Sequence, residues 1–295
     1  MSFERHATSK ISNAKDLFNL QTMGFRGEAL ASIASVAQVE LKTRQAHDEI
    51  GTFIEIEGTQ TRQETISCPI GTSFNVKNLF FNVPARRKFL KSNTTELRHI
   101  SETFQRIALT YPDIYFSLTH NNSDIYLLPQ TNLRQRIVQI FGKKINQQLL
   151  TIEAKTSIVN ISGFVGNIDS AGKSVPQFFF VNGRYMRHPY FHKAVTEAYS
   201  RILKPEQTPA YFIYFDINPA AIDINVHPTK TEIKFQDERE IWQILTVCVK
   251  EALGKFNVVP SIDFDTEGKI DFPIEQPTII PKTITPNFDS NYNPF

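Results

Sequence analysis

Two short motifs, far apart in the chain, combine residue types that suit the binding of phosphate. The first is Gly24-Phe25-Arg26-Gly27, which leads into the helix-forming run Glu28-Ala29-Leu30-Ala31. A glycine loop that enters a helix presents unpaired N–H groups and the positive end of the helix dipole to an anion. A bare Gly-x-x-Gly is more often an ordinary turn, so its interpretation depends on the residues that accompany it.

The second motif, His227-Pro228-Thr229-Lys230, ends in a cation. The His-Pro pair predicts a restricted turn from which the Lys230 ammonium can reach a phosphate. Near the start of the chain, Thr8, Ser9 and Lys10 place two hydroxyls before another ammonium, which also suits phosphate oxygens. Taken singly, these segments describe a surface lysine and a solvated polar turn. Together they predict a nucleotide site shared between two domains.

The elements that must position these motifs follow from hydrophobic periodicity. Alternation of apolar and polar residues predicts an antiparallel sheet and then a hairpin that turns at Asn121-Asn122. Later apolar runs predict a second sheet of mixed pairing with a crossover helix. The expected strands are 39–43, 52–57, 71–76, 114–118, 123–127, 157–165, 177–181 and 211–215. The expected helices are 94–108, 133–141, 192–203 and 239–250.

Three further runs accompany the two motifs in a fixed order. The five signatures are Arg5-His6-Ala7-Thr8-Ser9-Lys10-Ile11, the Gly24–Ile33 run, Gly71-Thr72 with Asn82-Val83-Pro84-Ala85-Arg86-Arg87-Lys88-Phe89-Leu90, Phe180-Val181-Asn182-Gly183-Arg184, and Asp223-Ile224-Asn225-Val226-His227-Pro228-Thr229-Lys230. In this order they resemble the MutL family of DNA mismatch-repair ATPases, over roughly residues 3–255. Five signatures in register are far harder to meet by chance than any one of them.

The resemblance implies an α+β fold in three parts. Residues 1–130 would form an incomplete two-layer α/β sandwich, the ATPase domain of the gyrase, Hsp90, histidine-kinase and MutL superfamily. Residues 131–256 would form a transducer domain like domain 2 of ribosomal protein S5. Residues 257–295, punctuated by prolines, would be a flexible linker. We expect a chain truncated at its N-terminus and lacking the family's C-terminal dimerisation domain, which is an endonuclease in some members.

The resemblance also implies the site residues and cofactors. Thr72 would lie on the adenine side, reached through water, and Lys230 would contact the γ-phosphate. The expected ATP-binding residues are Thr8, Ser9, Lys10, Gly24, Phe25, Arg26, Gly27, Glu28, Ala29, Leu30, Thr72 and Lys230. The family's catalytic Glu and Mg²⁺-binding Asn belong upstream of Arg5, so no catalytic residue is assigned. The intact protein is expected to be an ATPase that uses ATP and Mg²⁺, whereas this chain alone is expected to bind nucleotide poorly and hydrolyse it negligibly.

DNA contact in the family uses a basic groove that engages phosphates with little regard to sequence. The candidate residues are Lys91, Arg184, Arg187 and Arg239. Other partners implied by the resemblance are the mismatch-recognition protein MutS, downstream repair factors and a second copy in an ATP-dependent homodimer. Two alternatives stay open: a related ATPase such as a type II topoisomerase subunit, and a noncatalytic module that binds DNA or a partner.

Composition limits the remaining classes. The net charge of +2 neither demands nor excludes nucleic acid, and Cys68 and Cys248 have no metal-like spacing. No apolar run is long enough for a membrane span or signal peptide, so a cytoplasmic location is expected. Without covering elements, Phe53, Ile54 and Phe74 are expected to be exposed on one face, which would destabilise the first domain relative to the second.

Overall fold

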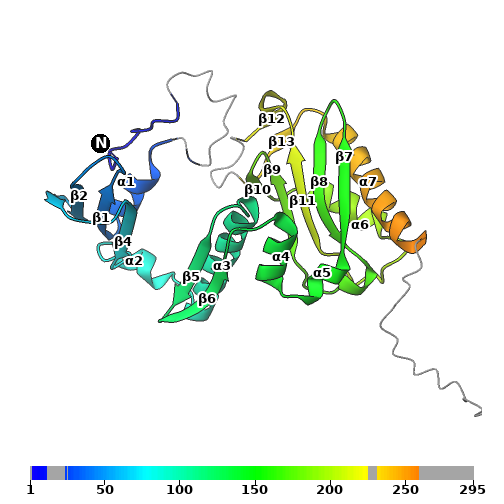
Figure 1. The fold of residues 1–295 in the computed structure, drawn as a ribbon, viewed down its shortest axis with the longest axis horizontal. Helices are drawn as coiled ribbons and strands as arrows, with labels where there is room; N and C mark the ends of the chain where they lie inside the picture. Colours follow the sequence, from blue (N-terminus) through cyan, green and yellow to red (C-terminus); the bar gives the residue numbers. More distant parts are fainter. Residues whose placement is uncertain (1, 12–23, 25, 225–230, 259–295) are drawn as a thin grey trace, which may run out of the picture. The chain divides into compact units, whose positions relative to one another are not determined.

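The computed structural model describes residues 2–11, 24, 26–224 and 231–258. Figure 1 shows a smaller sheet built from the first part of the chain and a larger, helix-covered sheet built from the later part. The mixture of antiparallel sheets and helices confirms the α+β class. No helix within the described residues is both long and apolar enough to cross a bilayer. Those residues also contain no cluster of three metal-ligating side chains.

The first sheet has four antiparallel strands in the order β3-β2-β1-β4. They are β1 (Gln38–Arg44), β2 (Gly51–Glu57), β3 (Gln60–Ile66) and β4 (Gly71–Lys77). The structure confirms the three strands expected here and adds β3. Sequence reasoning missed β3 because Gln-Thr-Arg-Gln-Glu-Thr has no apolar alternation, and pairing with β2 alone makes it a strand.

One face of this sheet carries α1 (Ala29–Ala34) and a small core. Ala34, Val39 and Ile56 are buried there, with Ile54 packed against them. Phe74 pairs with Leu41 across the ladder and is 44% exposed, as expected. The expectation for the other two residues is wrong. Ile54 is half-buried in the core, and Phe53 alternates to the opposite face, where the Lys42 ammonium lies 5.8 Å from its ring centre.

A helix and a hairpin follow the first sheet. The short α2 (Pro84–Lys88) precedes α3 (Asn93–Thr110), which the Ser92 hydroxyl caps by accepting from the Thr95 N–H. The hairpin of β5 (Phe116–His120) and β6 (Ser123–Leu128) turns at Asn121-Asn122, where both residues have positive φ as the expected turn requires. Phe104 of α3 contacts rings on both strands, so hairpin and helix pack as one unit.

A buried arginine anchors the next helix, α4 (Leu133–Phe141), whose bounds match the prediction. The Arg136 side chain is 0% exposed, and its guanidinium donates to the carbonyls of Leu128, Pro112, Ile114 and Pro129. Burial lowers the pKa of Arg136. Four backbone carbonyls, in place of a carboxylate, accept hydrogen bonds from this buried cation. Because two of the carbonyls belong to the end of the hairpin and two to the segment after α3, the arginine connects α4 to both.

The second sheet has five strands in the order β10-β9-β11-β8-β7, with β9 and β11 parallel and every other pair antiparallel. The mixed pairing and the crossover helix α6 (Pro189–Ala198) between β9 and β11 confirm the prediction. Sequence reasoning missed β7 and β10. The strands are β7 (Leu149–Lys155), β8 (Asn160–Gly166), β9 (Gln177–Val181), β10 (Arg184–Met186) and β11 (Tyr211–Asp216).

Helices cover both faces of the second sheet (Figure 1). On one face, α6 and α7 (Glu238–Val258) bury a core that includes Phe179 and Phe215. On the other face, α4 and α5 (Lys144–Gln148) pack on Phe180 and Phe212. The remaining short elements are the 3₁₀ turns η2 (Ile168–Ser170) and η3 (Pro219–Ala221) and the two-residue strands β12 (Ile222–Asp223) and β13 (Lys234–Phe235).

Candidate functional site

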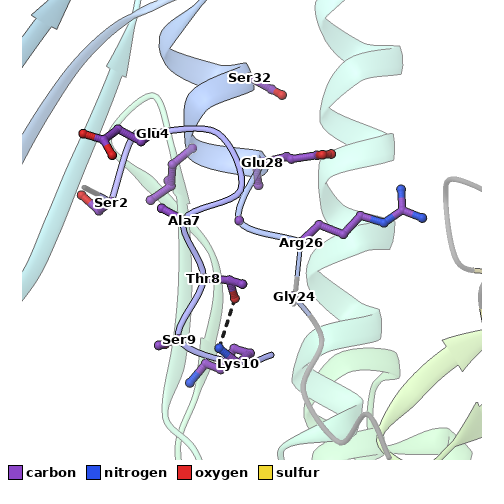
Figure 2. A pocket seen from close by; sticks show the side chains of 13 residues that line it. Ser2, Glu4, Ala7, Thr8, Ser9, Lys10, Gly24, Arg26, Glu28 and Ser32 are labelled. Carbon is purple, nitrogen blue, oxygen red and sulfur yellow. Dashed lines mark hydrogen bonds between the residues drawn. The ribbon is translucent and has the colours of Figure 1, made fainter. Parts of the chain in front are cut away.

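A cavity of about 920 Å³ lies between two segments near the start of the chain. One segment runs from residue 7 to residue 10, and the other includes Gly24 and residues 26–30. Figure 2 shows Thr8, Ser9 and Lys10 running alongside Gly24 and Arg26. The volume is in the range of small-molecule and cofactor sites. Its lining residues are Ser2, Glu4, Ala7, Thr8, Ser9, Lys10, Gly24, Arg26, Gly27, Glu28, Ala29, Leu30 and Ser32.

Gly27 determines how closely the two segments approach. Its φ is +64°, a left-handed conformation that favours glycine, and a Cβ at this position would lie 2.3 Å from the Ala7 carbonyl oxygen. The backbone of the glycine loop therefore packs directly on the backbone of Ala7, which immediately precedes the Thr8–Lys10 segment. The first glycine, Gly24, has open space where its Cβ would be, so it contributes no such contact.

Polar side chains give the cavity both signs of charge. The main-chain N–H of Lys10 donates to the Thr8 hydroxyl at 3.1 Å, a bond drawn in Figure 2. His6 Nδ1 lies 3.3 Å from the Glu28 carboxylate, which links the two segments a second time. Both of those side chains are largely solvated, so their pairing adds little stability. The ammonium of Lys10 and the guanidinium of Arg26 are the cations of the cavity.

The structure brings together most of the residues that the sequence assigned to this site. Thr8, Ser9, Lys10, Gly24 and the run Arg26–Leu30 all line the cavity. Phe25 and Lys230 lie outside the described residues. Thr72 does not line the cavity; it lies on β4, and its hydroxyl is 2.8 Å from that of its cross-strand partner Thr43.

The glycine run enters a helix, as expected, but α1 has only six residues and Glu28 at its N-cap makes no side-chain cap. Sequence reasoning missed four lining residues. Ala7 and Ser32 had a signal, because Ala7 sits inside the Arg5–Ile11 run and Ser32 inside the Gly24–Ile33 run. Nothing in the sequence marked Ser2 and Glu4, because local folding alone brings them to the cavity.

The four candidate DNA-binding residues lie in three places: before α3, on and just after β10, and on α7. Lys91 precedes α3, and its main-chain N–H donates to the Glu96 carboxylate at 2.9 Å. Burial lowers the pKa of Arg184 on β10. Arg187, just after β10, is exposed and hydrogen-bonded to the Tyr185 hydroxyl, which raises its pKa. Arg239 is exposed on the first turn of α7. Whether these residues share one DNA surface stays a prediction.

Comparison with known proteins gives a consistent result. The profile of a family described as "DNA mismatch repair protein, C-terminal domain" matches residues 137–254. The protein named "DNA mismatch repair protein MutL" of Bacteroides fragilis is 58% identical over 297 residues, which cover 100% of this chain and 48% of that protein. The protein of the same name from Phocaeicola vulgatus is 59% identical over 302 residues, with the same coverage. The chain thus spans about half the length of these curated relatives.

Two solved structures share the fold. The N-terminal domain of a DNA repair protein superposes with a TM-score of 0.69 at 24% identity, covering 81% of this chain and 78% of that one. The MutL ATPase domain of Aquifex aeolicus, complexed with ADP, gives a TM-score of 0.55 at 23% identity and covers 79% of this chain and 80% of that one. The expected combination of an ATPase-type sheet with an S5-like sheet agrees with both.

Proposed function

Because the chain belongs to the MutL family of DNA mismatch repair proteins, we propose that it supplies the nucleotide-binding and transducer part of an ATP-dependent repair protein. In this role the protein is a clamp that links recognition of a mismatch to downstream repair. Membership of this family favours this function over that of a type II topoisomerase subunit. The observation that carries the proposal is the cavity between the Thr8–Lys10 segment and the glycine loop.

The residues of the cavity fit the phosphates of a nucleotide. Gly24 and Gly27 line the cavity without a side chain, so N–H groups of the loop can approach phosphate oxygens. The Lys10 ammonium and the Arg26 guanidinium balance the negative charge. The relative from Aquifex aeolicus was solved with ADP, which supports a nucleotide as the ligand here.

The rest of the nucleotide chemistry rests on the family resemblance. We assign the contact with the γ-phosphate to Lys230 and the water-mediated contact with adenine to Thr72. Mg²⁺ would neutralise charge on the phosphates when bound. The proposal assigns no general base to the chain, so ATP hydrolysis requires groups beyond those named here.

The proposed partners follow from the same role. DNA would be held through its phosphates by basic residues, the candidates being Lys91, Arg184, Arg187 and Arg239. The mismatch-recognition protein MutS and downstream factors would bind the nucleotide-loaded form, in which two copies associate. The proposed location is the cytoplasm.

Equilibrium binding of a fluorescent ATP analogue tests the nucleotide site. Gly27→Ala should abolish binding, because the new Cβ collides with the Ala7 backbone and separates the two segments. Lys10→Gln keeps the backbone and should weaken binding about fivefold through loss of one charged contact. Gly58→Ala and Lys193→Gln are the matched controls. Gly58 also has positive φ but open space at its Cβ, and Lys193 lies on α6.

Equal effects of the site variants and their controls would overturn the proposal. Competition by unlabelled ADP separates true binding from adsorption of the dye. Lys230→Ala tests the contact assigned to the γ-phosphate: it should weaken binding of the ATP analogue more than binding of ADP.

A further inference from the structure

A second cavity, of about 340 Å³, lies at the edge of the larger sheet, beside the first turns of α6. The nucleotide site does not use it, and of its lining residues only Arg187 is among the candidate DNA contacts named above. Phe179 and Met186 form an apolar part of its wall, and no acidic side chain is among the described residues that line it. Six lining residues carry polar side chains or positive charge: Gln177, Tyr185, Arg187, His188, His192 and Tyr211.

Arg187 gives the cavity a fixed positive charge. Its guanidinium is hydrogen-bonded to the Tyr185 hydroxyl, and this contact raises the pKa of Arg187. Tyr185 is held in turn from α3, because the Arg106 guanidinium lies 4.2 Å from the centre of its ring. Glu102 faces both arginines and is 3.7 Å from Arg106. Tyr185 therefore orients Arg187, whose guanidinium carries five N–H donors in a planar fork.

His192 gives the cavity a neutral hydrogen-bond donor. Its Nδ1 lies 3.0 Å from the Tyr211 hydroxyl. Burial lowers the pKa of His192 and raises the pKa of Tyr211, so both are neutral near pH 7. Donation from the Tyr211 hydroxyl to Nδ1 is the arrangement that leaves the proton of the neutral ring on Nε2. That tautomer presents an N–H instead of a lone pair at the other edge of the ring.

The helix α6 reinforces this charge pattern. It has ten residues and begins at Pro189, next to the cavity. His188 caps the helix, because its Nδ1 accepts a hydrogen bond from the Phe191 N–H at 3.3 Å. The positive end of the helix dipole thus adds to the guanidinium of Arg187 and the N–H of His192. The Arg187 guanidinium, the His192 N–H and the N-terminus of α6 all favour an oxyanion as the ligand.

We infer that this cavity binds a phosphate group, held by the Arg187 guanidinium and the His192 Nε2–H. The cavity is larger than a phosphate ion, which leaves room for one substituent on the phosphorus. The group comes either from the backbone of DNA or from free phosphate. A DNA phosphate as the ligand rests on the proposed function, which makes Arg187 a DNA contact. Free phosphate as the ligand is independent of the proposed function.

Titration with inorganic phosphate, followed by amide NMR of the whole chain, tests the inference. We expect saturable shifts at Arg187 and His192, and at Thr231, whose carbonyl accepts from the Arg187 N–H at 2.8 Å. His192→Gln should weaken phosphate binding about tenfold, the usual cost of one hydrogen bond to a charged group. Tyr211→Phe keeps the ring but frees the tautomer, so it should weaken binding by a smaller factor. Lys193→Gln, one residue away on α6, removes a charge outside the lining and should change affinity less than twofold.

Competition with a short DNA duplex distinguishes the two sources. If the duplex displaces phosphate, and if His192→Gln weakens the binding of phosphate and of the duplex alike, the cavity holds a DNA phosphate. Phosphate binding that the duplex leaves unchanged supports a free phosphate. The inference is overturned if phosphate causes no shifts at Arg187 and His192 and if His192→Gln binds DNA as well as the parent chain does. That result would leave DNA binding elsewhere on the chain unaffected. Nucleotide binding at the Gly27 cavity is measured separately, so its failure is not confused with failure here.

Discussion

The two large sheets of this protein are built from strands of similar length but are covered to different extents. In the second sheet, α6 and α7 cover one face and α4 and α5 the other, and Phe180, Phe212 and Phe215 are fully enclosed. In the first sheet the buried cluster is Ala34, Val39 and Ile56, and every residue of β4 is exposed. Apolar alternation thus predicts a strand in both places but does not predict its burial.

This difference has an energetic consequence. Apolar burial stabilises by roughly 25 cal/mol for each Å² removed from water, so a face without a covering layer contributes little. The ladder hydrogen bonds of β3 and β4 also exchange with water more easily than those of enclosed strands. Within the described residues, the second sheet therefore carries most of the stability, while the proposed nucleotide cavity adjoins the weaker one.

The largest expected effect is a contrast in local stability between the sheets. Hydrogen exchange should show amides of β8, β9 and β11 protected roughly a hundredfold or more beyond those of β3 and β4. Limited proteolysis should leave a stable product that contains residues 157–255. Equal protection in both sheets, or loss of that product at the same rate as the first sheet, would break the comparison.

A pair of phenylalanine substitutions sharpens the contrast at single residues. Phe180 is 0% exposed, and its ring centre lies 4.6 Å from that of Tyr214, so Phe180→Ala should lower the free energy of unfolding by about 3–5 kcal/mol. Phe74→Ala should cost less than about 1 kcal/mol, because this side chain is 44% exposed. Chemical denaturation monitored by circular dichroism measures both. Similar costs would mean that Phe74 is enclosed in solution.

A smaller effect should appear as pH dependence in the second sheet's helices. His188, 8% exposed, has its pKa lowered by burial to about 4, and this burial outweighs the Glu238 carboxylate 3.5 Å away. Between pH 6.5 and 4 this histidine is protonated in the unfolded chain but neutral in the folded chain. The free energy of unfolding therefore decreases as the pH is lowered through that window. The expected loss from pH 7.5 to pH 5 is about 2 kcal/mol, and His192 adds to it in the same direction.

His188→Asn is the matched variant for this pH effect, since an asparagine side chain can still cap α6 but does not titrate. The loss of stability between pH 7.5 and 5 should shrink in this variant and retain only the part due to His192. An unchanged pH profile would show that His188 is solvated.

Several elements could be predicted from local sequence because local physics determines them. The helix 133–141 has its observed bounds, and the Asn121-Asn122 turn adopts the positive φ that such turns require. The nucleotide-site residues from Thr8 to Leu30 were assigned through five ordered signatures, and most of them line one cavity. Other features had no local signal. β3 becomes a strand only by pairing with β2, and the hydrogen bond between the Thr72 and Thr43 hydroxyls forms only because β4 pairs with β1.

The sequence by itself determined the family, the alternating strands and the residue types that suit phosphate, because each depends on neighbours along the chain. Only the tertiary structure decided which strands are enclosed, since burial depends on the layers that pack above a strand. The strand register decided that Phe74 shares a face with Ile54, because both pair with Leu41. The tertiary structure also placed His192 and Tyr211, which the sequence did not single out, around one cavity with Arg187. Such sites form when β9, β10, β11 and α6 meet, and the distances between those elements are set by the packing of the core.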